Sequence, residues 1–276
     1  MIKKLLYLFT AAVLLASCRP SGSANKNIVS VTILPQKYIV ERLTDSALTV
    51  NVLVPQGMSP ENCDFTIETL KALSNSSVCL YLGTMPFEQA QLLPFLENNK
   101  EIRGVCVADG CPENETDDPH VWLSPLNAAH IAKTTAAVLS ELYPEMEETI
   151  SGNCALLCSE FGSIDSYLRN VLEGKRSKTF LIYHPALTQF SHTYGLEQLA
   201  VENDGKEPAP AYLSSLLKEA GEKNASLFLI QSEIHETSAE TVAKESGCTA
   251  VTFDPLAADF MAEMRHLAET FETYMK

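Results

Sequence analysis

Three local motifs are missing from this chain of 276 residues, and each absence argues against a class of protein. No two cysteines have CxxC spacing, which argues against a zinc ribbon and a thioredoxin-type redox site. No glycine-rich loop ends in Gly-Lys-Ser or Gly-Lys-Thr, so any ATP hydrolysis belongs to another chain. His235 and Glu236 begin the HExxH pattern of zinc proteases, but Ala239 stands where the second histidine is required.

Basic residues are scarce. The chain has 20 lysines and arginines against 35 aspartates and glutamates, a net charge of −15. Removal of Lys3 and Lys4 with an N-terminal signal would leave 18 basic and 35 acidic residues, a net charge of −17. So acidic a surface argues against nucleic acid as a partner and is compatible with a cationic ligand. Solubility alone would also explain the charge.

The apolar run at the N-terminus, Leu5 to Ala16, is too short to cross a bilayer as a stable helix but suits a signal peptide. It ends in Leu-Ala-Ser-Cys, which resembles the lipobox of bacterial lipoproteins, in which the cysteine receives the lipid. We therefore expect a lipoprotein signal peptide over residues 1–18, with Cys18 lipidated, and a flexible tether over residues 19–27. A plain secretory signal is the alternative. The mature protein is expected outside the cytoplasm, held to the cell envelope only by its lipid.

Eight cysteines in an exported protein would suggest disulfides, but Cys18 is assigned to the lipid, and the remaining seven cannot all pair. Cys106 and Cys111 are close enough in sequence to close a small loop. Cys154 and Cys158 stand four apart on an expected helix and could equally be buried thiols.

Strand-like and helix-like segments alternate through two parts of the chain, which predicts an α/β protein with two lobes, each with a small, mostly parallel sheet. The first lobe is expected over residues 28–144 and the second over residues 175–276. Their expected strands are Ile28–Leu34, Leu48–Val54, Val78–Leu82 and Gly104–Val107 in the first lobe, and Thr179–Tyr183, Gln198–Glu202, Leu227–Gln231 and Thr249–Phe253 in the second.

Between the lobes, residues 145–174 have a helical pattern that would extend roughly 40 Å at 1.5 Å per residue. This is longer than one layer of a small domain, so we interpret it as one helix connecting the lobes. Two shorter helices broken at Gly162 are the alternative.

Four metal-type side chains stand at or beyond the carboxyl ends of expected strands. His184 and Asp254 directly follow strands of the second lobe, while His120 and Glu61 lie in loops after strands of the first. Open α/β sheets bind ligands beyond these strand ends, so we expect all four at one cleft between the lobes. Two imidazoles and two carboxylates suit Zn²⁺, and also Mn²⁺ or Fe²⁺ with added water.

The chain resembles the metal-specific substrate-binding proteins of bacterial zinc and manganese ABC transporters, from about Ile28 to its C-terminus. The matching segments are Leu53–Gly57, Asp118–Pro125, Tyr183–Ala186, Tyr194–Leu196, Glu207–Pro210 and Asp254–Ala257. The resemblance implies that His120, His184 and Asp254 correspond to three of the family's four metal ligands. It also implies that the long helix is the rigid connector between the lobes.

The chain departs from the family at the fourth ligand. Where the family usually has a histidine in a Gly-x-Asp-Pro-His loop, this chain has Gly-Met-Ser-Pro-Glu, ending at Glu61. Glu61 either ligates as a carboxylate or leaves a position to water; Cys63 is a weaker substitute because nearby acids raise a thiol's pKa. The family's His-rich loop is replaced by a short acidic one, Asp109–Asp118, either a weak cation collector or a plain solvated loop.

The resulting hypothesis is a monomeric, extracytoplasmic, lipid-anchored protein that captures a divalent transition metal, zinc above manganese or iron, and delivers it to an ABC permease. It binds rather than catalyses. One rival is a metallohydrolase in which three ligands hold the ion and Glu61 activates water. The other is an adhesin-like lipoprotein with a vestigial site.

Overall fold

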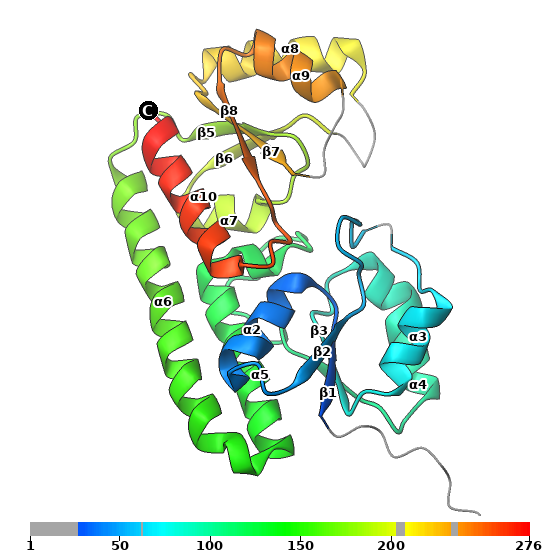
Figure 1. Cartoon of the computed structure of the whole chain (residues 1–276). Helices are drawn as coiled ribbons and strands as arrows, with labels where there is room; N and C mark the ends of the chain where they lie inside the picture. Colours follow the sequence, from blue (N-terminus) through cyan, green and yellow to red (C-terminus); the bar gives the residue numbers. More distant parts are fainter. Residues whose placement is uncertain (1–26, 62, 203–207, 233–236) are drawn as a thin grey trace, which may run out of the picture.

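The structure, a computed structural model, describes residues 27–61, 63–202, 208–232 and 237–276, which form two parallel sheets joined by packed helices (Figure 1). The first sheet has the strand order β2-β1-β3-β4 and the second β6-β5-β7-β8, and every pairing is parallel. The strands are β1 Ile28–Val31, β2 Thr49–Val52, β3 Val78–Tyr81, β4 Arg103–Cys106, β5 Thr179–Ile182, β6 Glu197–Ala200, β7 Leu227–Gln231 and β8 Thr249–Phe253. The expected α/β class is confirmed. The expected signal peptide, with Cys18, and nearly all of the tether lie outside the described residues.

Helices cover both faces of the first sheet, as parallel strands require (Figure 1). Alternate side chains of β3 pack in opposite directions, Leu80 into the main core and Cys79 into a smaller cluster with Leu73 and Leu96. The helices on the main-core side are α2 (Leu34–Thr44) and α5 (Pro125–Leu142); those on the other side are α3 (Ile67–Ser74) and α4 (Leu93–Asn98), the latter preceded by a π-helical turn, Glu88–Leu92.

The second sheet is sandwiched in the same way. Phe180 of β5 packs edge-on against Phe271, with ring centroids 5.2 Å apart, and Phe271 stacks on Phe190 at 5.3 Å. The next residue, Leu181, faces a separate cluster with Leu216 and Val242. The helices on the first side are α7 (Thr188–Tyr194) and α10 (Phe260–Tyr274), and those on the second are α8 (Pro210–Glu222) and α9 (Thr237–Glu245).

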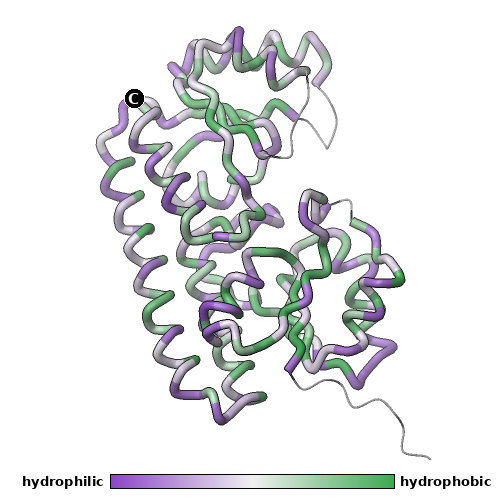
Figure 2. Tube along the Cα trace, viewed as in Figure 1, coloured by the Kyte–Doolittle hydropathy of each residue, from purple (hydrophilic) through white to green (hydrophobic). Residues whose placement is uncertain are grey.

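One helix, α6 (Glu147–Glu173), runs beside both lobes after a 3₁₀ turn at Pro144–Met146 (Figure 1). Its hydrophilic and hydrophobic residues alternate along its length (Figure 2), and the buried ones face α2, α5 and α10. The helix runs through Gly162 without interruption. The prediction of a single long helix is confirmed, and the alternative of two shorter helices is wrong.

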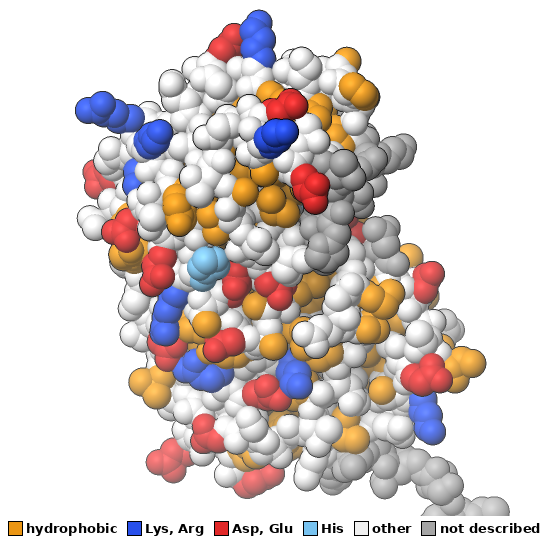
Figure 3. Space-filling model, turned by 45° about the horizontal axis from the view of Figure 1, so that its top comes forward, with side chains coloured by type: hydrophobic (Ala, Val, Ile, Leu, Met, Phe, Trp, Pro, Cys, Tyr) orange, Lys and Arg blue, Asp and Glu red, His pale blue; other side chains and the backbone are white. Residues whose placement is uncertain are grey.

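All seven described cysteines are free. The small loop between Cys106 and Cys111 is therefore not closed by a disulfide. The sulfurs of Cys154 and Cys158 lie 3.9 Å apart and form no disulfide. None of the helices in the described ranges combines the length and the apolar character that crossing a bilayer requires. On the face shown in Figure 3, acidic and basic side chains are interspersed rather than gathered by sign.

Candidate metal centre

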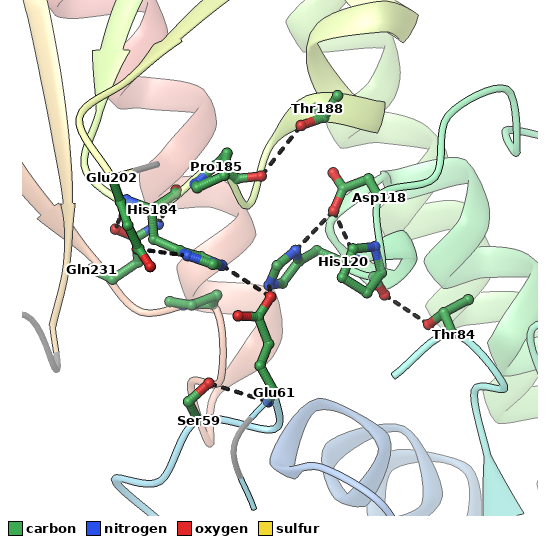
Figure 4. A network of polar contacts seen from close by, with 12 residues as sticks. Ser59, Glu61, Thr84, Asp118, His120, His184, Pro185, Thr188, Glu202 and Gln231 are labelled. Carbon is green, nitrogen blue, oxygen red and sulfur yellow. Dashed lines mark hydrogen bonds and ion pairs between the residues drawn. The ribbon is translucent and has the colours of Figure 1, made fainter. Parts of the chain in front are cut away.

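Three of the four expected ligands converge between the lobes. The potential ligand atoms of Glu61, His120 and His184 all lie within 4.8 Å of one another (Figure 4). Oε1 of Glu61 is 3.3 Å from Nε2 of His184 and 4.0 Å from Nε2 of His120. The two imidazole rings meet edge to face, with centroids 5.2 Å apart.

Local contacts hold each of these three residues in place. The main-chain N–H of Glu61 donates to Oγ of Ser59 at 3.2 Å in the loop that follows β2. His120 precedes a 3₁₀ turn, and the hydroxyl of Thr84 donates to the main-chain oxygen of Pro119 at 2.7 Å. His184 stands just beyond β5, where its main chain faces the side chain of Gln231.

The amide of Gln231 makes two hydrogen bonds to His184. Its Oε1 accepts the His184 main-chain N–H at 3.2 Å, and its Nε2 donates to the His184 main-chain oxygen at 2.7 Å. Gln231 ends strand β7, the neighbour of β5 in the sheet. The histidine is thus fixed from two adjacent strands.

A carboxylate stands behind each imidazole (Figure 4). Asp118 Oδ1 lies 2.8 Å from Nδ1 of His120, and Glu202 Oε2 lies 2.9 Å from Nδ1 of His184. When Nδ1–H of a histidine is bonded to a carboxylate, the ring is fixed in orientation and its other nitrogen is left to bind a metal. In both residues that other nitrogen is Nε2, and it faces Glu61.

The charges of the site shift two pKa values. The hydrogen bond from His184 lowers the pKa of Glu61 below its ordinary value, against the opposing effect of burial. Burial would by itself lower the pKa of His184, but the hydrogen bond to Glu61 and the negative charges of Glu61 and Glu202 outweigh it and raise the pKa to about 9. Without a metal, His184 is therefore a cation between two carboxylates near neutral pH.

Trp122 closes one side of the centre. Its ring centroid lies 5.2 Å from that of His120, and its indole N–H donates to the main-chain oxygen of Pro255 at 2.8 Å. Trp122 thus packs against the ring of His120. Between these groups lies a cavity of about 20 Å³, also lined by His184 and Leu256.

Asp254 is not part of the three-residue cluster. Its Oδ1 accepts the main-chain N–H of Leu256 at 2.9 Å, while its own N–H donates to Glu263 at 2.9 Å. The residue lines a larger cavity of about 390 Å³, together with Ile33 and Met58 of the first lobe and Ser232 of the second. Its role as a ligand stays a prediction.

Cys63 is buried away from the described ligand cluster. Burial, and to a smaller degree the charge of Asp64, raises the pKa of its thiol above the ordinary value. A thiol that keeps its proton is a poor metal ligand at neutral pH. This agrees with the expectation that Cys63 is the weaker substitute for Glu61.

Sequence reasoning assigned no role to Glu202 or Gln231, and it placed Asp118 only in the acidic loop and in a segment that resembles the family. Glu202 stands just beyond β6, the strand beside β5, and Gln231 ends the strand on the other side of β5. A signal was present, since polar residues at the ends of strands adjacent to that of His184 must lie near it. The order of strands in the sheet was the missing fact.

Two imidazole nitrogens and a carboxylate oxygen suit borderline and hard divalent cations of the first transition series. Each imidazole has its supporting carboxylate, and Glu61 brings a negative charge. The donors are preorganised, and a bound cation would replace the proton of His184. The chemistry of the donor set therefore fits a bound divalent transition metal.

The model of the zinc-uptake complex component A periplasmic family, ZnuA, matches residues 29–274. The chain belongs to this family. The crystal structure of a ZnuA covers 90% of this chain and 98% of its own, with a TM-score of 0.81 and 29% sequence identity. The resemblance to this family and the two-lobed fold are thus confirmed.

Curated relatives of this ZnuA-family chain are more distant. The zinc-binding lipoprotein AdcA of Streptococcus pneumoniae is 23% identical over 266 residues, covering 89% of this chain and 53% of AdcA. The chain thus spans about half the length of that relative. A putative metal-binding protein of Chlamydia trachomatis is 22% identical over 259 residues, covering 90% of this chain and 91% of its own.

Proposed function

We propose that this protein captures a divalent transition metal ion, zinc in preference to manganese or iron, between its two lobes and delivers it to the permease of an ABC transporter. The observation that carries the proposal is the convergence of Glu61, His120 and His184 within 4.8 Å, with each imidazole supported by a carboxylate. Asp254 is the proposed fourth ligand. The family and the zinc-binding relatives support zinc as the ion.

Capture rather than catalysis suits the position of Glu61. A hydrolase of the alternative kind would need this carboxylate free to activate a water molecule. Here its Oε1 lies among the ligand atoms, 3.3 Å from Nε2 of His184. Glu61 is therefore placed to ligate the ion together with the two histidines, and not to activate a water molecule beside it.

The protein would act outside the cytoplasm as a lipoprotein anchored through Cys18. The support is the Leu-Ala-Ser-Cys ending of the N-terminal apolar run and the lipoprotein among the relatives. The chain contains no P-loop, so ATP hydrolysis would be the work of other subunits.

Elemental analysis of protein purified without added metal, followed by competition titration with a zinc chelator, tests the proposal. We expect one ion per chain, with affinity at least about tenfold weaker in His184→Ala and in Glu61→Ala. His266→Ala is the matched control, because His266 is exposed on α10 and outside the cluster, with its Nε2 3.1 Å from the main-chain oxygen of Thr252.

Three results would count against the proposal. A metal-free protein that binds no added zinc would contradict capture. Unchanged affinity in Glu61→Ala would remove the carboxylate from the ligand set. Turnover of esters, peptides or phosphates by the zinc-loaded protein, lost in His120→Ala, would support the hydrolase instead.

A further inference from the structure

The acidic loop Asp109–Asp118 is held by buried amide side chains from both lobes. On the first-lobe side, Asn127 of α5 accepts the main-chain N–H of Glu113 at 3.0 Å and donates to the Glu113 main-chain oxygen at 2.7 Å. On the second-lobe side, the loop contacts Gln189, which lies in the first turn of α7. The exposed fraction of Gln189 is 2%.

One side-chain oxygen of Gln189 accepts three hydrogen bonds from the loop. Its Oε1 accepts the main-chain N–H of Glu115 at 3.1 Å, that of Thr116 at 3.2 Å and the Thr116 hydroxyl at 3.0 Å. This buried oxygen fully uses its capacity to accept hydrogen bonds. Its removal would leave the donors of Glu115 and Thr116 without their partner, which is costly for buried polar groups.

The same turn of α7 reaches the carboxylate behind His120. The main-chain N–H of Gln189 donates to Oδ2 of Asp118 at 3.0 Å, while Oδ1 accepts the main-chain N–H of His120 at 3.0 Å and lies 2.8 Å from its Nδ1. Thr116 connects the two contacts, because its Oγ1 also accepts the main-chain N–H of Asp118 at 3.3 Å.

We propose that Gln189 is a positioning residue for the metal centre: through Thr116 and Asp118 it holds the His120 imidazole from the opposite lobe. The inference rests on the proposed function, since it concerns the same site. The Gln189 side chain fixes the acidic loop, the loop fixes Asp118, and Asp118 turns Nε2 of His120 toward Glu61.

This arrangement couples the two histidines. Helix α7 begins at Thr188, shortly after His184, so one helix turn follows the first histidine and supports the second. Separation of the lobes along this contact would remove the support of His120 and weaken the hold on the ion.

In this arrangement the acidic loop connects the two lobes rather than collecting cations. Glu113 is hydrogen-bonded to the hydroxyl of Ser124, and Glu115 pairs with His192 at 2.9 Å. Asp118 is engaged with His120. These three carboxylates have partners within the protein.

The first test uses metal-free, full-chain protein and does not depend on zinc. The variants are Gln189→Leu, which removes the acceptor, and Gln189→Glu, which keeps it. Gln198→Leu is the matched control, because Gln198 also holds the start of α7, at the Leu187 N–H (2.9 Å), but from β6 in the same lobe.

Hydrogen exchange and NMR of the side-chain Nδ1–H of His120 provide the metal-free readouts. We expect Gln189→Leu to speed exchange at the amides of Glu115 and Thr116 at least about tenfold and to lose the protected Nδ1–H signal. Gln189→Glu and Gln198→Leu are expected to keep both. Retention of the Nδ1–H signal in Gln189→Leu would overturn the proposal.

The second test measures zinc affinity by chelator competition. Supporting partners of a ligand typically contribute about 10–100-fold in metal affinity, so we expect Gln189→Leu to bind zinc at least about tenfold more weakly. Gln189→Glu should recover most of the loss, and Gln198→Leu should stay within about threefold of wild type.

Thr116→Val provides a milder variant should Gln189→Leu fold poorly, since it removes only the hydroxyl between Gln189 and Asp118. It should also lose the Nδ1–H signal, and Gln189→Leu should weaken zinc binding little further in its background. Additive losses would mean that Gln189 acts independently of the loop and would overturn the proposal. If the wild type binds no zinc, the proposed function fails, while the metal-free signal still decides the role of Gln189.

Discussion

Trp122 and Pro255 join the two lobes across the metal centre: the indole N–H of Trp122 donates to the main-chain oxygen of Pro255 at 2.8 Å. Trp122 belongs to the turn that carries His120, and Pro255 follows β8 of the second sheet directly after Asp254. The exposed fraction of Trp122 is 1%. One buried hydrogen bond therefore connects the turn that carries His120 to the residue that follows Asp254.

Zinc binding should change the fluorescence of Trp122. This is the chain's only tryptophan, and its ring centroid lies 5.2 Å from that of His120, so a cation at His120 changes the field around the indole. We expect a saturable, single-site change on zinc titration, lost in His120→Ala and kept in His266→Ala. Bound zinc, shown by elemental analysis, without any change in emission would place the ion elsewhere.

The affinity for zinc should fall with decreasing pH. The pKa of His184 is raised to about 9, so below that pH the metal must displace its proton. This group alone should weaken apparent affinity about tenfold per pH unit between about pH 8 and 6.5. Glu202→Gln should move the fall to lower pH, because it removes one of the charges that raise the pKa of His184. A pH-independent affinity in this range would contradict the prediction.

The stability of the metal-free protein should depend on pH in the opposite direction. The pKa of His184 is higher in the folded chain, at about 9, than its ordinary 6.5, so the folded state holds this proton more tightly. The contribution, at most about 3 kcal/mol, is fully present below about pH 6.5 and is lost as pH rises through about 9. Thermal unfolding with a chelator present measures it. His184→Gln should lack this component.

Asp254→Asn decides whether Asp254 is the fourth ligand. We expect zinc affinity to fall about 10–100-fold, because an amide oxygen carries no charge to replace that of the carboxylate. The amide oxygen of the substituted side chain can still accept the N–H of Leu256, so the loop should keep its shape and the unfolding temperature should change little. Wild-type affinity in this variant would leave three protein ligands and a water molecule.

Glu88→Gln should destabilise the first lobe. The Glu88 carboxylate is fully buried and accepts the Thr32 hydroxyl at 2.6 Å and the main-chain N–H groups of Leu82 and Gly83 at 3.0 and 2.6 Å. A glutamine would turn an NH₂ group toward some of these donors, at a cost of about 1–3 kcal/mol. Chemical denaturation measures the loss. Glu97→Gln, on the exposed surface of α4, is the control and should stay within about 0.5 kcal/mol of wild type.

Much of the architecture follows from the sequence alone. Apolar runs such as Val78–Leu82 are too uniformly hydrophobic for a sheet with one face exposed to water, so they predict parallel strands covered by helices on both sides. His184 was predicted at a strand end, and Pro119 placed His120 in a turn rather than on a helix. Local chain properties determine all of these features.

Tertiary packing decided which side chains meet. Glu61 joined the two histidines while Asp254 was placed on a neighbouring cavity, although the sequence matched Asp254 to a family ligand and left open whether Glu61 ligates. The hydrogen bond from Gln189 of α7 to Asp118, the residue behind His120, joins segments 71 residues apart in the chain. Side-chain direction at such a junction depends on strand order and on the relative placement of two lobes, and neither has a local signature. The sequence therefore determined the kind of site and its imidazoles, and the packing of the lobes determined how its carboxylates are arranged around them.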